Sequence, residues 1–211
     1  FAAGAALPTV YPTSYAALLW RAPVVAGETV LVHAAAGGVG LSAVQIAKAL
    51  GARVIATAGG PEKLAIAEQA GADVLIDYRQ EDFVPRVLEE TDGRGADVIY
   101  DSVGGATTDR SLKCINWNGR LLVIGFASGD IPHVKMNRVL LKNISLVGLH
   151  WSAYPDREPE RIDECIEGLF AMAAEGKIDP LISAVYPLDE AGEALRALAS
   201  RKTTGKIVLA P

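Results

Sequence analysis

The sequence predicts an α/β fold built on a doubly wound parallel sheet. From residue 29 onward, short runs rich in β-branched residues alternate with longer segments of helical periodicity. The first run, residues 29–33, has a continuous rather than an alternating apolar centre, which is typical of a strand buried on both faces. A glycine-rich turn directly follows this run and opens a helix. Strands connected in this way pair in parallel through right-handed crossovers, so helices cover both faces of the sheet.

The composition limits the class of protein. The chain has 211 residues, half of them hydrophobic and 21% charged, which is enough apolar surface for one large domain with a well-buried core. A net charge of −5 argues against a broad nucleic-acid or anionic-membrane surface. Cys114, Cys165 and three scattered histidines form neither a disulfide framework nor a metal-ligand spacing. Because cysteines are so few, we expect a cytoplasmic protein.

The first 20 residues carry no charge, which raises the question of a membrane span. Pro8 and Pro12 interrupt this stretch, and polar residues lie beside them, so a buried loop-and-helix segment is the better interpretation. The chain starts at Phe1 without a methionine, from which we expect that an upstream part has been removed.

The alternating segments can be assigned in chain order. After strand 29–33, a helix over 38–50 ends at Gly51, where glycine is favoured. Strand 53–57 follows, and Pro61 opens a helix that continues to residue 70. The remaining predicted elements are strands over 73–76, 97–100, 120–124 and 144–149 and helices near 80–90, 106–113 and 136–141.

After residue 155 the rhythm changes. The periodicity predicts a long amphipathic helix over 159–175, with Ile166 and Phe170 on its apolar face. A strand over 182–186, a helix over 189–199 and a strand over 206–209 complete the chain. We therefore divide it into residues 1–180 and a short return excursion, residues 181–211.

The turn after the first strand carries the clearest functional signal. Its sequence, Ala-Ala-Ala-Gly-Gly-Val-Gly at 34–40, aligns with the GxGxxG pattern with Ala35 in the first glycine position. The absence of a side chain at Gly37 lets a pyrophosphate approach the backbone, and Gly40 lets the helix pack closely on the sheet. The helix N-terminus supplies N–H groups and a positive potential for the phosphates. The strand–turn–helix context therefore predicts a dinucleotide site.

The end of the second strand indicates which dinucleotide binds. NAD sites place an acidic residue about 20 residues beyond the glycines, where it binds the ribose 2′-hydroxyl. Here residues 57–60 read Thr-Ala-Gly-Gly, and the first carboxylate is Glu62, in the next helix. Lys63 follows as a cationic partner for a phosphate. We therefore predict that the cofactor is NADPH.

Several motifs then point to a family. The chain contains HAAAGGVG at 33–40, IDYR at 76–79, DSVGG at 101–105, GRLLVIG at 119–125 and TTGKIV at 203–208. In this order they resemble the quinone oxidoreductase branch of the medium-chain dehydrogenase/reductase superfamily. The resemblance implies that residues 1–180 form a Rossmann-type NADP(H)-binding domain. It also implies that residues 181–211 belong to a GroES-like catalytic domain whose N-terminal part lies outside this sequence.

The resemblance also implies cofactor contacts. It places Tyr15 and the pair His150 and Trp151 near the nicotinamide, and Gly37, Gly38 and Val39 at the pyrophosphate. It places Gly59, Lys63 and Tyr78 around the adenosine 2′-phosphate, Ser102 beside the ribose, Gly125 and Phe126 beside the cofactor, and Arg201 on a phosphate.

A departure from the superfamily bears on the chemistry. Zinc-dependent members carry a ligand cysteine shortly before the segment that corresponds to residues 13–15, and Thr9 occupies that place here. We therefore expect a zinc-independent enzyme. Its catalytic side chains would lie largely in the catalytic domain, so none is assigned, and we expect this chain alone to be inactive.

The implied activity is hydride transfer from NADPH to a quinone or another electron-poor, enone-type substrate. Two alternatives remain open. The chain could belong to a non-catalytic NADPH-binding protein, or it could be an enoyl-reductase module of a larger synthase.

Strand 144–149 predicts a homodimer. As the sixth strand of a doubly wound sheet it is expected at an edge, and it has neither proline nor charge to protect it. Pairing with its own copy across a two-fold axis would satisfy both edges, and members of this family usually dimerise in this way. The alternative is that helix 159–175 or a loop covers the edge. We expect no nucleic-acid or membrane partner.

Overall fold

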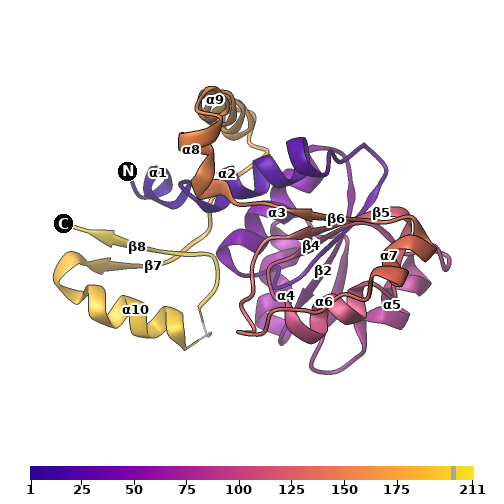
Figure 1. The fold of residues 1–211 in the computed structure, drawn as a ribbon. Helices are drawn as coiled ribbons and strands as arrows, with labels where there is room; N and C mark the ends of the chain where they lie inside the picture. The colour runs from indigo at the N-terminus through magenta and orange to yellow at the C-terminus, as the bar shows by residue number, and fades with distance from the viewer. Residues whose placement is uncertain (201–202) are drawn as a thin grey trace.

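A six-stranded parallel sheet forms the centre of the computed structural model, which describes residues 1–200 and 203–211 (Figure 1). The strand order is β3-β2-β1-β4-β5-β6, so the direction of winding reverses between β1 and β4. This order confirms the predicted doubly wound sheet. The strands are β1 (Thr29–Val32), β2 (Arg53–Ala58), β3 (Val74–Asp77), β4 (Ala96–Asp101), β5 (Ile115–Val123) and β6 (Ser145–Gly148).

Helices cover both faces of the sheet, and each face has its own apolar core. Along β1, Val30 and Val32 point into one core and Leu31 into the other, which explains the continuous apolar run of this strand. The helices that connect the strands are α3 (Gly38–Ala49), α4 (Pro61–Gln69), α5 (Phe83–Glu90), α6 (Gly105–Ser111) and α7 (Met136–Lys142).

The N-terminal segment is helical and largely buried where it meets the sheet. It contains α1 (Ala2–Ala6), α2 (Val10–Tyr15) and a π-helix, η1 (Ala16–Arg21). A hydrogen-bonded group of hydroxyls fixes α2 to the domain, since Ser14 Oγ lies 2.8 Å from both Ser42 Oγ and Tyr100 Oη. No helix among the described residues is long and apolar enough to cross a membrane.

Strand β5 begins earlier than the sequence suggests. The sequence predicts a start at Arg120, whereas the strand begins at Ile115, which pairs with Ala96 of β4. A register shift follows between Ala96 and Val98, and Asn118 takes a positive φ of 59°. The residues of this bulge are mostly polar or exposed, so the segment lacks the apolar pattern that predicts a strand.

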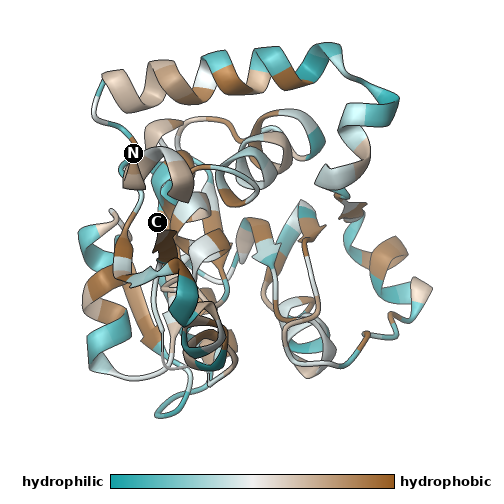
Figure 2. Ribbon diagram, turned by 90° about the vertical axis from the view of Figure 1, so that its left-hand side faces the viewer, coloured by the Kyte–Doolittle hydropathy of each residue, from teal (hydrophilic) through white to brown (hydrophobic). Residues whose placement is uncertain are grey.

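After β6 the chain forms η2 (Trp151–Ala153), α8 (Tyr154–Arg157) and the long helix α9 (Glu160–Ala174). Figure 2 shows polar and apolar residues alternating along α9, at the top of the view. Cys165 and Leu169 are buried, but Ile166 and Phe170 are 40% and 60% exposed. The predicted apolar face is therefore wider than the buried face, because α9 packs against the rest of the described residues along a narrow stripe.

The C-terminal residues form a separate layer beside the main sheet (Figure 1). Strands β7 (Ile182–Pro187) and β8 (Lys206–Ala210) pair in parallel, connected by η3 (Leu188–Glu190) and α10 (Ala191–Ala199). Just before β8, Gly205 forms a β-bridge with Gly37, so the end of the chain returns to the glycine turn. The domain division between residues 180 and 181 remains a prediction.

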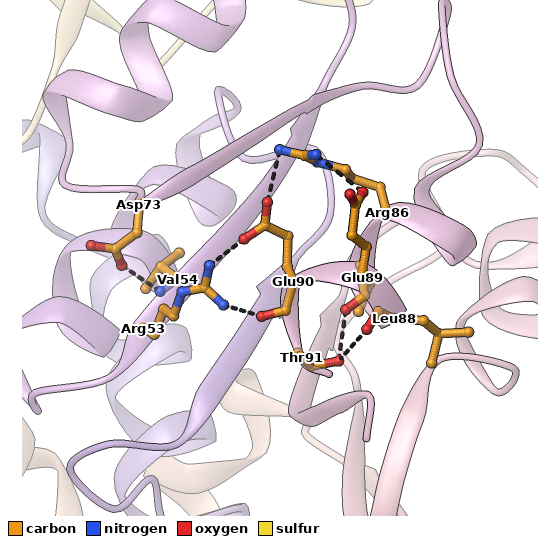
Figure 3. Close-up of polar contacts among 9 residues, drawn as sticks. Arg53, Val54, Asp73, Arg86, Leu88, Glu89, Glu90 and Thr91 are labelled. Atoms are coloured by element: carbon orange, nitrogen blue, oxygen red, sulfur yellow. Dashed lines mark hydrogen bonds and ion pairs between the residues drawn. The ribbon is translucent and has the colours of Figure 1, made fainter. Parts of the chain in front are cut away.

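At the amino end of β2, charged groups fasten the strand to α5 and to the residue that precedes β3 (Figure 3). Arg53, at the start of β2, bonds to both the carbonyl and the carboxylate of Glu90, and Arg86 contacts the same carboxylate at 2.7 Å. Asp73 accepts the backbone N–H of Val54 at 2.7 Å. These contacts lie at the end of the sheet opposite the carboxyl ends of the strands, where the candidate site lies.

Candidate functional site

The glycine turn has the geometry that its sequence predicts. Gly37 is the N-cap of α3, and no side chain caps the first N–H groups of that helix. A Cβ added at Gly40 would lie 2.3 Å from the carbonyl oxygen of Ala34, so only glycine fits there. At Gly37 the same distance is 3.3 Å, which is tight but accessible. The left-handed residue of the turn is Ala34, with φ 51°, one position before Ala35.

A cavity of about 650 Å³ opens beside this turn, within the usual size range of ligand sites. It lies at the carboxyl ends of the strands, next to the point between β1 and β4 where the winding reverses. The residues that line it are His33, Ala34, Ala36, Gly37, Gly38, Thr57, Ala58, Gly59, Lys63, Tyr78, Arg79, Phe83, Val103, Thr107, Arg110, Ala127, Ser128, Leu198, Thr203 and Gly205.

One end of the cavity is cationic, and no Asp or Glu is among the described residues that line the cavity. Lys63, at the start of α4, and Arg79, just after β3, contribute positive charge beside Gly59. Tyr78 also lines this end and is 51% exposed. Although the chain carries a net charge of −5, the positive charge at this end of the cavity favours an anionic group of a ligand.

His33 forms part of the inner wall of the cavity. Its Nδ1 lies 3.0 Å from Thr57 Oγ1 and its Nε2 lies 2.8 Å from Ser111 Oγ, so both ring nitrogens are bonded inside the protein. Its ring meets Phe83 edge-on at 4.8 Å. Burial lowers the pKa of His33 to about 4, although the charge of Asp101 opposes this effect. The imidazole is therefore neutral at pH 7 and holds β1, β2 and α6 together.

Asp101 shapes the loop after β4. Its Oδ1 accepts the N–H groups of Val103 and Gly104 at 2.8 and 2.9 Å, and its Oδ2 accepts the hydroxyl of Thr108. This carboxylate, at the end of β4, therefore orients the loop. Ser102 lies in that loop, and its hydroxyl is 3.5 Å from the carbonyl oxygen of His33.

The structure brings five of the predicted contact residues together at the cavity wall. They are Gly37, Gly38, Gly59, Lys63 and Tyr78. Four others lie within two residues, along the sequence, of residues that line the cavity but do not line it themselves. They are Val39, Ser102, Gly125 and Phe126. Their contacts with a cofactor remain predictions.

The structure does not bring Tyr15, His150 or Trp151 to this cavity. Tyr15 is 7% exposed, meets Trp20 edge-on at 5.6 Å and packs on Gly168 of α9, so its evident role is packing. Trp151 stacks on Tyr154 at 5.3 Å, while His150 lines a smaller cavity beside β6. Their predicted proximity to a nicotinamide remains a prediction. Arg201 lies outside the described residues.

Sequence reasoning missed several residues of the wall. Arg110 is the clearest, because its guanidinium lies 4.5 Å above the ring of Phe83 and pairs with Asp82 at 2.6 Å. Arg79 was visible within the motif at 76–79, and parallel pairing of β2 with β3 would have placed it opposite the Gly-Gly turn. Leu198 and Thr203 come from the return segment, whose docking no local pattern reveals.

The central part of the sequence matches a known protein family. Residues 38–167, which contain the glycine helix and five of the six sheet strands, match the family described as zinc-binding dehydrogenase. The chain belongs to this family. Within the zinc-binding dehydrogenases it falls in the quinone oxidoreductase branch, as its motifs predict.

Three similarities illustrate this placement. It is 43% identical over 211 residues to the quinone oxidoreductase-like protein 2 homolog of Nematostella vectensis, covering 99% of this chain and 58% of that relative. The quinone oxidoreductase of Escherichia coli, solved as a complex with NADPH, superimposes with a TM-score of 0.87 at 36% identity, over 97% of this chain and 64% of that one. A phthioceranic/hydroxyphthioceranic acid synthase of Mycobacterium bovis is 33% identical over 99% of this chain, which covers 10% of the synthase.

The name of the family mentions zinc, which raises the question of metal ligands in this chain. Within residues 1–200 and 203–211, no three His, Cys, Asp or Glu side chains form a group that could hold a metal ion. Both cysteines are buried, and burial raises the pKa of each thiol to about 12. Neither thiol is therefore poised as a thiolate ligand.

Proposed function

We propose that this chain is the NADPH-binding part of an oxidoreductase that transfers hydride from NADPH to a quinone or another electron-poor, enone-type substrate. The observation that carries the proposal is one continuous cavity with two distinct ends. The uncapped N-terminus of α3 at Gly37 forms one end, and the cationic turn at Gly59 and Lys63 forms the other.

The residues present fit this cofactor. Gly37 and Gly38 provide backbone N–H groups and helix-dipole potential where a pyrophosphate would lie. The neutral turn at Ala58 and Gly59 leaves space where an NAD site would place a carboxylate, and Lys63 provides a charge for a 2′-phosphate. These features favour NADPH over NADH.

Bound NADPH would supply the hydride, whereas the chain's own residues would bind and orient it. The neutral His33 and the loop shaped by Asp101 keep the cavity wall rigid without placing a charge on it. We further propose that the reaction is independent of zinc, because Thr9 occupies the place of the ligand cysteine. A cytoplasmic location agrees with the scarcity of cysteines.

We also propose a homodimer that forms through β6. This strand ends the sheet, and Leu146 on it is 36% exposed. The preceding helix, α7, exposes Met136, Leu140 and Leu141 by 69 to 79% of their surface. An apolar sheet edge flanked by an apolar helix is the kind of surface that a second copy covers.

The similarity to a multifunctional synthase supports a second candidate, an enoyl-reductase module within a longer chain. Both candidates use NADPH and reduce an electron-poor carbon–carbon bond or ring, so they share this binding site. The higher identity to the Nematostella vectensis relative favours the first.

The binding proposal is tested by titrating the purified chain with NADPH and with NADH and following nicotinamide fluorescence. We expect clearly tighter binding of NADPH. Equal affinities would contradict the role proposed for the neutral turn. The activity is tested on the full-length gene product with NADPH and a panel of quinones and enones, where reduction of neither class would refute the proposed reaction.

A further inference from the structure

The side chain of Arg79 lies across the turn that follows β2. Register pairs Ala58 with Asp77, and Tyr78 N–H donates to the carbonyl of Ala58 at 3.3 Å, so the residues after β3 face the Gly59–Gly60 turn. A Cβ added at Gly59 would lie 2.8 Å from Arg79 Nε, and one added at Gly60 would lie 3.6 Å from Nη1. Arg79 is exposed, and its guanidinium lies against the turn.

The backbone of Arg79 is held in place. Its N–H donates to Asp77 Oδ1 at 3.0 Å, and the carbonyl of Asp77 accepts the N–H groups of Gln80 and Glu81 at 2.9 and 3.0 Å. Asp77 thus caps a tight turn with both its side chain and its main chain. These bonds hold the backbone of Arg79 beside the cavity without the help of a ligand.

The charge of Arg79 has no carboxylate partner among the residues that the structure describes. This distinguishes it from Arg110, another arginine on the wall, which is paired with Asp82. A guanidinium at the cavity wall without an acid beside it can bind an anion without first breaking an ion pair. Its planar fork matches two oxygens of one phosphate, whereas a lysine ammonium acts as a point charge.

We propose that Arg79 is a specificity-determining residue whose guanidinium binds the 2′-phosphate of NADPH together with Lys63. This inference rests on the proposed cofactor. A phosphate monoester carries close to two negative charges at pH 7, so two cations from different elements match it better than Lys63 alone. The proposal also accounts for the glycine at position 59. Any side chain there would displace Arg79 and Tyr78 from the turn.

The test compares Arg79→Ala and Arg79→Lys with Arg94→Ala. Arg94 is also exposed and lies outside the cavity, so its replacement controls for the loss of one surface charge. Affinities are measured by calorimetry for NADPH, NADH, adenosine 2′,5′-bisphosphate and AMP. We expect Arg79→Ala to weaken both 2′-phosphorylated ligands about tenfold or more and to change the other two less than about twofold.

Arg79→Lys should restore part of the loss, since it keeps the charge but not the fork. If the unmodified chain prefers NADPH and Arg79→Ala binds it as Arg94→Ala does, the role of Arg79 is refuted while the proposed function stands. If the unmodified chain binds neither dinucleotide, the proposed function itself fails and this inference fails with it. An equal loss for NADPH and NADH would also overturn it, because the contact would then not be with the 2′-phosphate.

Discussion

Gly37 and Gly205 form a parallel β-bridge, which joins the glycine turn near the start of the chain to the return segment near its end. Gly205 N–H also donates to the carbonyl of Ala36 at 2.9 Å. The turn that would bind a pyrophosphate is therefore supported from outside by residues that follow α10. Leu198 and Thr203, from the same return segment, also line the cavity.

Replacing Gly205 should loosen that support. Gly205 has φ 53°, and an added Cβ would lie 2.5 Å from the carbonyl oxygen of Leu181. We expect Gly205→Val to weaken NADPH binding severalfold and to speed proteolytic cleavage near the return segment. Gly4→Val, at a site with open space, serves as the control. Unchanged affinity in Gly205→Val would show that the bridge does not shape the site.

The two glycines at opposite ends of the turn should behave differently. Gly37→Val should leave folding nearly intact and abolish NADPH binding, because the side chain would occupy the space of the pyrophosphate. Gly40→Ala should instead destabilise the fold by about 1–3 kcal/mol or more, since its Cβ would overlap the backbone of Ala34. Denaturant unfolding and fluorescence titration separate the two effects. A folded Gly37→Val protein with normal NADPH affinity would place the cofactor elsewhere.

Lys63 should contribute to cofactor choice. We expect Lys63→Ala to reduce NADPH affinity by roughly 1.5–3 kcal/mol, the value of a charge-assisted contact, and to leave NADH affinity nearly unchanged. Lys135→Ala removes an exposed lysine outside the cavity and should have no effect. Parallel losses for both dinucleotides in Lys63→Ala would argue for a structural role instead.

His33 should make the fold sensitive to acid. Its pKa is about 4 in the folded protein, below the ordinary histidine value of 6.5 that applies to the unfolded chain, so the unfolded chain takes up a proton first as the pH falls. Stability from this group is complete above about pH 6.5 and decreases as the pH falls toward 4, by about 3 kcal/mol at most. The non-titrating variant His33→Gln should lose less stability than the unmodified chain between pH 7 and pH 5 in guanidinium unfolding. Identical pH profiles would contradict the assignment.

The proposed dimer depends on the edge of β6. Leu146→Lys should convert a dimer to a monomer, because a charge on the free edge opposes strand pairing. Light scattering after size-exclusion chromatography measures the mass, and Leu195→Lys on α10 provides a matched exposed leucine. A monomeric unmodified chain at micromolar concentration would rule out the dimer, whatever the variant does.

Local sequence was informative wherever a local requirement fixes the residue type. The clearest case is the turn at 37–40, where close packing excludes any side chain at Gly40. The burial of β1 and the absence of an acidic residue at the end of β2 can both be predicted from residues that are adjacent in the sequence. Consequently the sheet, its winding and five residues of the cavity wall were predictable.

Other features depend on which segments meet in space. The bulged start of β5 forms because Ile115 pairs with Ala96, and the burial of Tyr15 requires Gly168 on a distant helix. Both are invisible in a window of neighbouring residues.

The sequence by itself determined the α/β fold, the dinucleotide turn and the cationic residue Lys63, because each depends on short-range backbone and side-chain chemistry. Only the tertiary structure placed Arg79 over Gly59, made His33 a neutral bridge between Thr57 and Ser111, and brought Gly205 to Gly37. These relationships arise from strand register and chain return, which bring together side chains that the sequence keeps apart.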